Sequence, residues 1–437
     1  MNKLNILNLA TEDYGGAGIA SKCFNDLFIN AGYNSILIVK QSNTRNKNVI
    51  VLEDLSSKYS LRWFFRKVVN YMNRLYLKNK VVPVDSKYVF SNVIESKQFY
   101  TAKKILKKTP FEPDIIILHW ISNFINSKTI KELNDQTKAK LIWIMMDNAP
   151  LTGGCHYPWD CKGFELDCSN CPAILNSSKL KIAQDNLTYK KNNLPTNLEL
   201  ITSSESDYRR ALKSSIYKTH KIHKILFPVD DNKFKPDCKK DAKAYWGIEE
   251  HIKVIFFGSI SLIDKRKGSM LFFEALLFLQ NKFKDEQVGI SNLLILIAGN
   301  ENQYFIKDLQ IHLKKIGYLT EEELIRAYQA ADVFVSASIE DSGPLMINQS
   351  IMCGTPVVSF EVGVALDLVD TGQTGYRAKL GDVEDLANGI IFVLQMRKNE
   401  YLKMSENCRD IGLTLCQPQK QIEIFIECFK TIQEYAK

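Results

Sequence analysis

The chain has 437 residues, of which 45% are hydrophobic and 24% are charged, and its formal net charge is +8. These proportions exclude a disordered protein, and no apolar run is long enough to predict a membrane span or a secretory signal. Lysine and arginine are spread along the sequence, which favours an anionic small ligand or an anionic membrane surface over nucleic acid. We therefore expect a cytoplasmic globular protein with two domains of about 200 residues.

Short apolar runs alternate with helical segments in the first half of the chain. A strand at 4–9, a helix at 17–31 and a strand at 35–39 form a predicted βαβ unit. Further buried parallel strands are expected at 115–118, 140–144 and 198–202. A polar, proline-bounded segment at 227–236 then suits a linker between two domains.

The second half begins its own series of apolar runs. Strands are expected at 254–257, 293–298, 333–336 and 356–359, with helices between them. The predicted fold class is therefore α/β, with two doubly wound domains. In such sheets ligands bind at the carboxyl ends of the strands, so each domain is expected to hold a cleft there.

The most informative motif follows the strand predicted at 333–336. It contains Asp341, Gly343 and Pro344, then a helix, and ends in a Gly-Thr-Pro before the next strand. Helix amino termini attract anions because their backbone N–H groups are unpaired. An acidic side chain beside such a site can accept hydrogen bonds from sugar hydroxyls. The motif therefore predicts a site for a phosphorylated sugar; the alternative is a surface carboxylate before an ordinary helix.

The order of motifs along most of the chain resembles the retaining glycosyltransferases of the GT-B fold, specifically glycosyltransferase family 4. The matching segments are 15–18, 119–121, 147–172, 265–268, 298–299 and 341–358. The resemblance implies two Rossmann-like domains that face each other across a cleft. The implied divisions are an acceptor domain at 1–225 with a cysteine-rich insertion at 151–175, a donor domain at 226–405, and a helical segment at 406–437 that packs back toward the first domain.

The resemblance also implies a donor site. Lys267 would place its ammonium group against the nucleotide diphosphate and offset the charge of the leaving group, so that no catalytic metal is required. Asp341 would accept hydrogen bonds from donor-sugar hydroxyls, and Gln349 would face the ribose. Backbone groups at the start of the same helix would meet phosphate or sugar, namely those of Gly343, Pro344 and Leu345. The alternative for Lys267 is a solvated lysine in a basic turn.

Three donor-facing positions depart from the family pattern. Relatives usually carry histidine at Met146, arginine at Ser259 and a second glutamate at Gln349. We expect Arg266 to supply the missing cation, because a guanidinium can bind phosphate with two hydrogen bonds. The departures keep two alternatives open: a nucleotide-sugar-binding GT-B protein without transfer activity, and a sugar-nucleotide epimerase of similar fold.

On the acceptor side, a glycine-rich turn would let the backbone approach a ligand at the start of a helix. This turn consists of Gly15, Gly16, Ala17 and Gly18. His119 and Asp147 each follow a predicted strand, where catalytic groups gather. We expect both to lie near the reacting groups. For His119 a structural role beside Trp120 is the alternative, and for the turn an ordinary strand-to-helix connection.

Four cysteines cluster in the insertion. Their spacing in a cytoplasmic protein argues against disulfides and fits two alternatives, a structural zinc site or reduced thiols in a packed loop. The residues concerned are Cys155, Cys161, Cys168 and Cys171.

Aromatic and basic residues alternate at helical spacing in the segment 61–78. Such a segment can lie in the lipid headgroup layer, and the alternative is a helix packed on the first domain. The resemblance as a whole implies a cytoplasmic enzyme, in peripheral contact with the inner membrane. It would move a sugar from a nucleotide-sugar donor to a glycan or lipid-linked glycan in bacterial surface polysaccharide biosynthesis, with retention of configuration and without binding nucleic acid.

Overall fold

The computed structural model describes residues 3–43, 46–52, 83–90, 94–284, 290–300 and 309–435. The chain forms two compact units, each with its own sheet and hydrophobic core. Unit 1 comprises Met1–Thr202 and Tyr208–His223, and unit 2 comprises Ser203–Asp207 and Lys224–Lys437. Helix α6 (Glu205–Lys213) therefore contributes residues to both units.

Unit 1 is built on a seven-stranded sheet with the order β3-β2-β1-β4-β5-β6-β7. Its strands are β1 (Asn5–Glu12), β2 (Asn34–Gln41), β3 (Val49–Val51), β4 (Ile115–Leu118), β5 (Lys140–Ile144), β6 (Glu199–Thr202) and β7 (Ile222–Lys224). Strand β1 pairs in parallel with both β2 and β4. The loops that leave β1 and β4 therefore start side by side, at the point where the strand order reverses. In doubly wound sheets this is where ligands bind.

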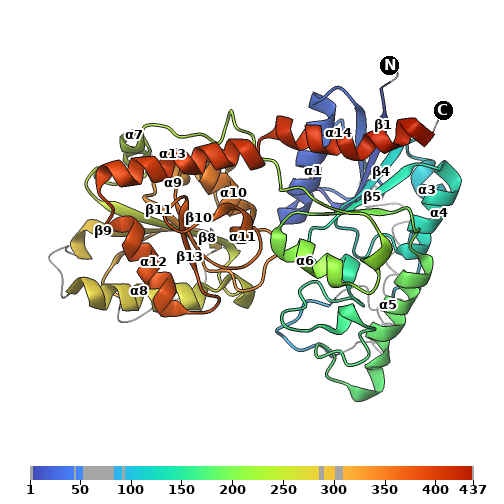
Figure 1. Cartoon of the computed structure of the whole chain (residues 1–437), viewed down its shortest axis with the longest axis horizontal. Coiled ribbons are helices and arrows are strands. Elements are labelled where there is room, and N and C mark those ends of the chain that lie inside the picture. Colours follow the sequence, from blue (N-terminus) through green and yellow to red (C-terminus); the bar gives the residue numbers. More distant parts are fainter. Residues whose placement is uncertain are drawn as a thin grey trace, which may run out of the picture. The chain divides into compact units, whose positions relative to one another are not determined.

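The helices of unit 1 connect successive strands (Figure 1). Among the described residues these helices are, besides α6, α1 (Gly15–Asn30), α3 (Ala102–Leu106), α4 (Ser127–Thr137) and α5 (Lys181–Asn193). Helix α4 begins where the Asn126 side chain accepts a hydrogen bond from the Thr129 N–H, which satisfies one of the unpaired donors of its first turn. All four residues of β4 are buried apolar side chains, which is typical of parallel strands covered on both faces.

Unit 2 contains a six-stranded sheet with the order β10-β9-β8-β11-β12-β13, and all its pairs are parallel. The strands are β8 (Lys253–Ser261), β9 (Leu293–Asn300), β10 (His312–Gly317), β11 (Val333–Ser336), β12 (Val357–Phe360) and β13 (Gly375–Ala378). Here the order reverses between β8 and β11. The loops that follow these two strands therefore lie at the second expected ligand edge.

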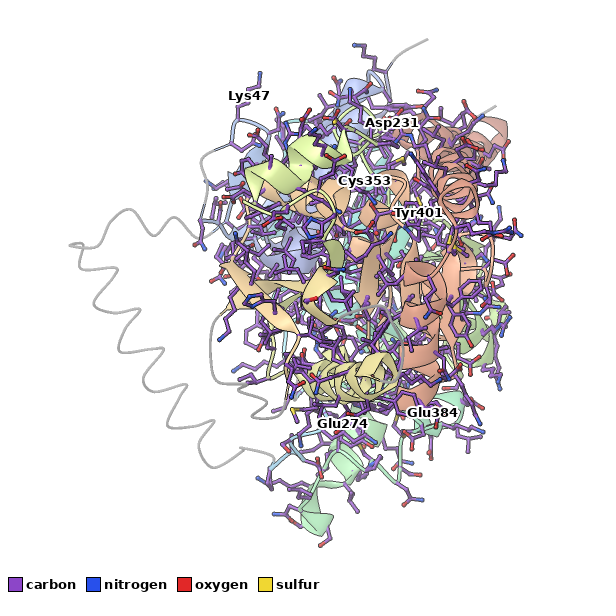
Figure 2. All side chains as sticks on the ribbon, turned by 90° about the vertical axis from the view of Figure 1, so that its left-hand side faces the viewer. Lys47, Asp231, Glu274, Cys353, Glu384 and Tyr401 are labelled. Atoms are coloured by element: carbon purple, nitrogen blue, oxygen red, sulfur yellow. The ribbon has the colours of Figure 1, made fainter. Side chains whose placement is uncertain are left out.

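Eight helices with described bounds belong mainly to unit 2. They are α7 (Lys239–Tyr245), α8 (Ser269–Lys284), α9 (Glu321–Ala330), α10 (Leu345–Met352), α11 (Ala365–Leu368), α12 (Val383–Leu394), α13 (Lys398–Leu415) and α14 (Pro418–Tyr435). Helices α8 and α12 pack against each other (Figure 1). Glu274 of α8 and Glu384 of α12 project outward, whereas Cys353 lies inside (Figure 2).

The nine strands predicted from the sequence are all present, at β1, β2, β4, β5, β6, β8, β9, β11 and β12. The α/β prediction is therefore confirmed. Helix α1 begins two residues before its predicted start. Among the described residues, no helix is long and apolar enough to cross a membrane. The segment 61–78 lies outside the described residues, and its contact with membranes stays a prediction.

Candidate donor site and a polar pocket in unit 1

Lys267 and Asp341 form an ion pair in unit 2, with 2.5 Å between the lysine Nζ and the carboxylate Oδ2. Lys267 lies in the turn after β8 and Asp341 in the segment after β11, which are neighbouring strands. The Asp341 side chain is 9% exposed and the Lys267 side chain 28%. Burial by itself would raise the pKa of Asp341, but the charges of Lys267 and Arg266 hold it below its ordinary value. The Asp341 carboxylate is therefore ionised at neutral pH.

The turn that carries Lys267 is fixed against the end of β11. Gly268 has φ +62°, and a Cβ at this position would lie 1.8 Å from the carbonyl oxygen of Ala337, so only glycine fits. The N–H of Ile339 donates to the carbonyl of Arg266 at 2.8 Å, which joins the two segments directly. Local backbone packing thus determines where the ammonium group of Lys267 is placed.

The start of helix α10 lies beside the same carboxylate. The N–H of Gly343 donates to Asp341 Oδ1 at 3.3 Å, and Ser338 Oγ donates to Oδ2 at 3.3 Å. Pro344 is the residue before the helix, and no side chain caps its first N–H groups. The predicted cation and the predicted helix start therefore meet at one carboxylate. Together they offer positive charge and unpaired N–H groups to an anion.

Three other predicted donor residues already have partners inside unit 2. Arg266 lies 2.5 Å from the carboxylate of Asp264, so its charge is partly satisfied without a ligand. The hydroxyl of Ser259 donates to the carbonyl of Ser261 at 3.0 Å. Gln349 accepts a hydrogen bond from the Tyr328 hydroxyl at 3.2 Å, and its amide is half-buried. Each could still contact a ligand, but only by sharing or exchanging these hydrogen bonds.

In unit 1, the glycine-rich turn follows β1 as expected. Gly15 has φ +68° and begins α1 without a side-chain cap, and Gly15 and Gly16 are both exposed. A Cβ at Gly18 would lie 2.7 Å from the backbone of Asp13, so the turn needs glycine there. Ala17 lies between Gly16 and Gly18 in the first turn of the helix. The turn thus presents open backbone at the reversal point between β1 and β4.

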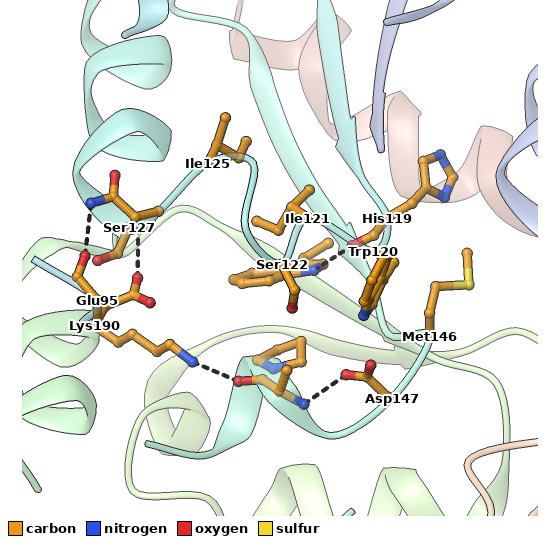
Figure 3. A pocket seen from close by; sticks show the side chains of 14 residues that line it. Glu95, His119, Trp120, Ile121, Ser122, Ile125, Ser127, Met146, Asp147 and Lys190 are labelled. Atoms are coloured by element: carbon orange, nitrogen blue, oxygen red, sulfur yellow. Dashed lines mark hydrogen bonds between the residues drawn. The ribbon is translucent and has the colours of Figure 1, made fainter. Parts of the chain in front are cut away.

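His119 lies at the end of β4, but its ring points into the core. It is 1% exposed, its Nε2 lies 3.0 Å from Asn8 Oδ1, and it stacks on Phe24. Burial lowers its pKa to about 3, so the ring is neutral. His119 is one of the residues that line the neighbouring pocket, and Figure 3 shows its ring pointing away from Asp147. The placement favours the structural alternative for His119 over contact with substrate, because nothing polar but Asn8 reaches the ring among the described contacts.

Asp147 lies after β5 and is paired with His156, which lies beside the cysteine cluster and was not among the predicted site residues. Its Oδ2 is 2.5 Å from His156 Nδ1, and its Oδ1 accepts the N–H of Ala149 at 2.8 Å. Both acidic and imidazole side chains are buried. His156 belongs to the insertion and directly follows Cys155. The only signal in the sequence that could have marked His156 is its place next to Cys155 in the cysteine cluster.

Asp147 also lines a small polar pocket in unit 1 (Figure 3). The cavity has a volume of about 20 Å³, and Trp120, Ser122, Glu95 and Lys190 are among its lining residues. The Lys190 ammonium donates to the carbonyls of Ala149 and Thr152 at 2.6 and 2.9 Å. The Glu95 carboxylate accepts the N–H of Ser127 at 2.9 Å.

Burial acts in opposite directions on the two charged groups of this pocket. It raises the pKa of Glu95 and lowers the pKa of Lys190, while the charge of each group partly offsets the shift of the other. Neither Glu95 nor Lys190 was predicted from the sequence. They come from segments far from each other in the chain, and no local motif marks them.

The four cysteines of the insertion gather around a second cavity of about 20 Å³. They form no disulfide, and burial raises the pKa of Cys168 to about 11 and also raises those of Cys155 and Cys171. Without a metal, these three thiols are therefore protonated at neutral pH. Within the described ranges, no three His, Cys, Asp or Glu side chains form a group that could hold a metal ion. The zinc site stays a prediction.

Solved structures similar to the chain cover nearly its whole length. Sucrose-phosphate synthase from Thermosynechococcus elongatus has a TM-score of 0.66 at 14% identity, covering 99% of this chain and 100% of that one. Anabaena Alr3699/HepE in complex with UDP-glucose has a TM-score of 0.61 at 15% identity, covering 98% and 100%. With its two doubly wound sheets, the chain therefore has the GT-B fold of glycosyltransferases.

Sequence comparison shows which family of GT-B proteins the chain resembles. Residues 239–411 match the profile of the family described as "Glycosyl transferases group 1". Phosphatidyl-myo-inositol mannosyltransferase of Mycobacterium leprae is 26% identical over 145 residues, which is 32% of this chain and 37% of that protein. Such matches span less than half the length of four curated relatives. Residues 239–411 are thus similar to the glycosyl transferases group 1 family, in agreement with the predicted family, and the predicted GT-B fold is confirmed.

Proposed function

We propose that the protein is a retaining glycosyltransferase that moves a sugar from a nucleotide-sugar donor to a hydroxyl of a glycan or lipid-linked glycan. The observation that carries this proposal is the contact between Lys267 and Asp341 beside the start of α10. A pyrophosphate needs positive charge and N–H donors, and a sugar needs a carboxylate that accepts hydrogen bonds. Unit 2 brings all three kinds of group to one edge of its sheet.

The proposed chemistry depends on charge stabilisation. When the bond between sugar and diphosphate breaks, negative charge grows on the leaving phosphate, and Lys267 and the α10 N–H groups stabilise it. Asp341 holds the sugar hydroxyls in position. An oxygen of the leaving diphosphate takes the proton of the acceptor on the same face of the sugar, which retains the configuration. No protein nucleophile and no catalytic metal are needed in this scheme.

We place the acceptor among membrane-linked or polymeric glycans, in the assembly of a bacterial surface polysaccharide on the cytoplasmic face of the membrane. One relative is named a phosphatidyl-myo-inositol mannosyltransferase, so its name specifies a lipid headgroup as acceptor. The basic and aromatic segment 61–78 offers a means of reaching a membrane surface.

A binding protein without transfer activity is the second candidate. Met146, Ser259 and Gln349 replace the residues of the family pattern, and Arg266 is already paired with Asp264. The absence of an arginine at Ser259 and the pairing of Arg266 lower the positive charge available to a donor. A sugar-nucleotide epimerase of similar fold is the third candidate. Its product would be an altered sugar that is still attached to the nucleotide.

Incubation with a panel of nucleotide sugars, followed by analysis of all products, separates these functions. A transferase gives transfer to an added glycan or lipid extract, or slow release of free sugar. Binding without turnover supports the second candidate, and an altered sugar on an intact nucleotide supports the third. Lys267→Ala is expected to reduce turnover at least about 100-fold. Lys265→Ala, which removes an exposed lysine from the same turn, is the matched control and should change turnover less than about twofold.

A further inference from the structure

His156 lies behind the polar pocket of unit 1 and contacts three of the residues that line it. Its Nδ1 lies 2.5 Å from Asp147, its Nε2 lies 3.5 Å from Ser122 Oγ, and its ring centre lies 6.1 Å from that of Trp120. The imidazole is almost completely buried. One side chain from the insertion thus touches a carboxylate, a hydroxyl and an indole that all face the same small cavity.

The backbone on both sides fixes this imidazole. The N–H of His156 donates to the carbonyl of Val89 at 2.8 Å, and its carbonyl accepts the N–H of Asn148 at 2.9 Å. Phe90 and Cys155 form an antiparallel bridge next to it. The insertion is therefore joined to the segment that follows β5, and His156 is the point at which it reaches the pocket.

The short contact with the Asp147 carboxylate, which can only accept hydrogen bonds, places a proton on His156 Nδ1. The Trp120 Nε1 lies 3.5 Å from the same nitrogen, and the Ser122 hydroxyl lies 3.5 Å from Nε2. Asp147 is held at its other oxygen by the N–H of Ala149. The carboxylate consequently has a fixed orientation at the pocket wall.

The pocket suits a group of one particular size and chemistry. A volume of about 20 Å³ holds a group the size of a water molecule but not a sugar ring. Its walls include the Asp147 and Glu95 carboxylates, which accept hydrogen bonds, and the Lys190 ammonium, which donates them. A hydroxyl can both donate and accept. The half-buried Trp120 adds an apolar face of the kind on which sugar C–H groups pack.

We propose that this pocket binds one hydroxyl group of a sugar or other polyol, and that His156 is the positioning residue that orients Asp147 and Ser122 toward it. The proposal rests on the proposed function, because the polyol is the acceptor of the transfer reaction. It assigns a role to the cysteine-rich insertion, which delivers His156 to the pocket.

The test uses the full-length protein, with methyl α-D-glucopyranoside and myo-inositol as polyol probes in saturation-transfer NMR. The wild-type protein is expected to bind at least one probe. His156→Ala and the more conservative His156→Gln are expected to weaken that binding about tenfold, while binding of nucleotide sugars changes less than about twofold. Imidazole added to His156→Ala is expected to restore probe binding, because it can fill the cavity and contact Asp147. A merely structural histidine would not give this rescue.

His251→Ala, which removes an exposed histidine from unit 2, is the matched control and should leave probe binding unchanged. Two results would overturn the proposal: no probe binding to the wild-type protein, which means that the pocket holds only water, or equal probe binding by wild type and a folded His156→Gln variant. If no nucleotide sugar binds or turns over although the probes bind, the proposed function fails while the pocket assignment stands.

Discussion

Lys267 and Asp341 are 74 positions apart in the sequence, yet their side chains meet at 2.5 Å at the edge of the unit 2 sheet. The contact arises because β8 and β11 are neighbours at the point where the strand order reverses. A buried carboxylate is stable there only because Lys267, Ser338 and Gly343 all donate to it. This arrangement prepares the site before any donor arrives.

The first prediction concerns the pH dependence of stability. The pKa of Asp341 is lowered in the folded protein, so its contribution to stability is present above the unfolded-state pKa and is lost as pH falls through the folded-state value. Asp341→Asn should lower the free energy of unfolding by about 2 kcal/mol at pH 7. The difference from wild type should shrink below about pH 4. Urea unfolding of both proteins at pH 7 and below about pH 4 measures this difference in the free energy of unfolding. A difference that does not depend on pH would contradict the ion pair.

The second prediction concerns Gly268. Gly268→Ala places a Cβ against the Ala337 carbonyl, so the turn that carries Lys267 must move. We expect a loss of about 3 kcal/mol in stability together with weaker donor binding. Gly372→Ala is the matched control, because Gly372 also has positive φ, at +84°, but open space around its Cβ. It should cost only about 1 kcal/mol, measured by thermal unfolding, and leave donor binding intact. Equal losses in both variants would mean that the close approach to Ala337 is not decisive.

The third prediction concerns the cysteines of the insertion. If they hold a structural zinc, protein purified without chelators should contain about one zinc per chain. Cys171→Ser should abolish zinc binding and lower the melting temperature, whereas Cys238→Ser, at an exposed thiol of unit 2, should change neither. Elemental analysis gives the answer. Less than about half an equivalent of zinc in the wild-type protein would favour reduced, packed thiols instead.

The fourth prediction concerns the segment 61–78. Vesicles that contain anionic lipid should bind the protein in flotation assays, and replacement of Trp63, Phe64 and Phe65 by Ser should reduce the bound fraction several-fold, because these rings would enter the headgroup layer. Vesicles of neutral lipid serve as the control, since electrostatic attraction is absent there. Unchanged binding of the triple variant would exclude this segment as the membrane contact.

The α/β class and the central strands could be predicted from the sequence alone, and so could the motif that we propose as the donor site. Central parallel strands are buried on both faces and therefore appear as continuous apolar runs such as Ile115–Leu118. The strands that escaped prediction are β3, β7, β10 and β13, and all four lie at the edges of their sheets. An edge strand pairs on one side only. β10, for example, is never fully buried, so its sequence carries no continuous apolar run.

Which polar residues share a site could not be predicted, because it depends on contacts between segments that are distant in the sequence. Asp147 was predicted from its place after a strand, but its partner His156 comes from an irregular insertion, and Glu95 and Lys190 reach the same pocket from separate segments. His119 follows a strand in the same way, yet its ring turns into the core toward Asn8. The end of a strand fixes the position of a residue's backbone, but packing decides the direction in which its side chain points. Contacts between segments distant in sequence leave no periodic pattern from which they could be predicted.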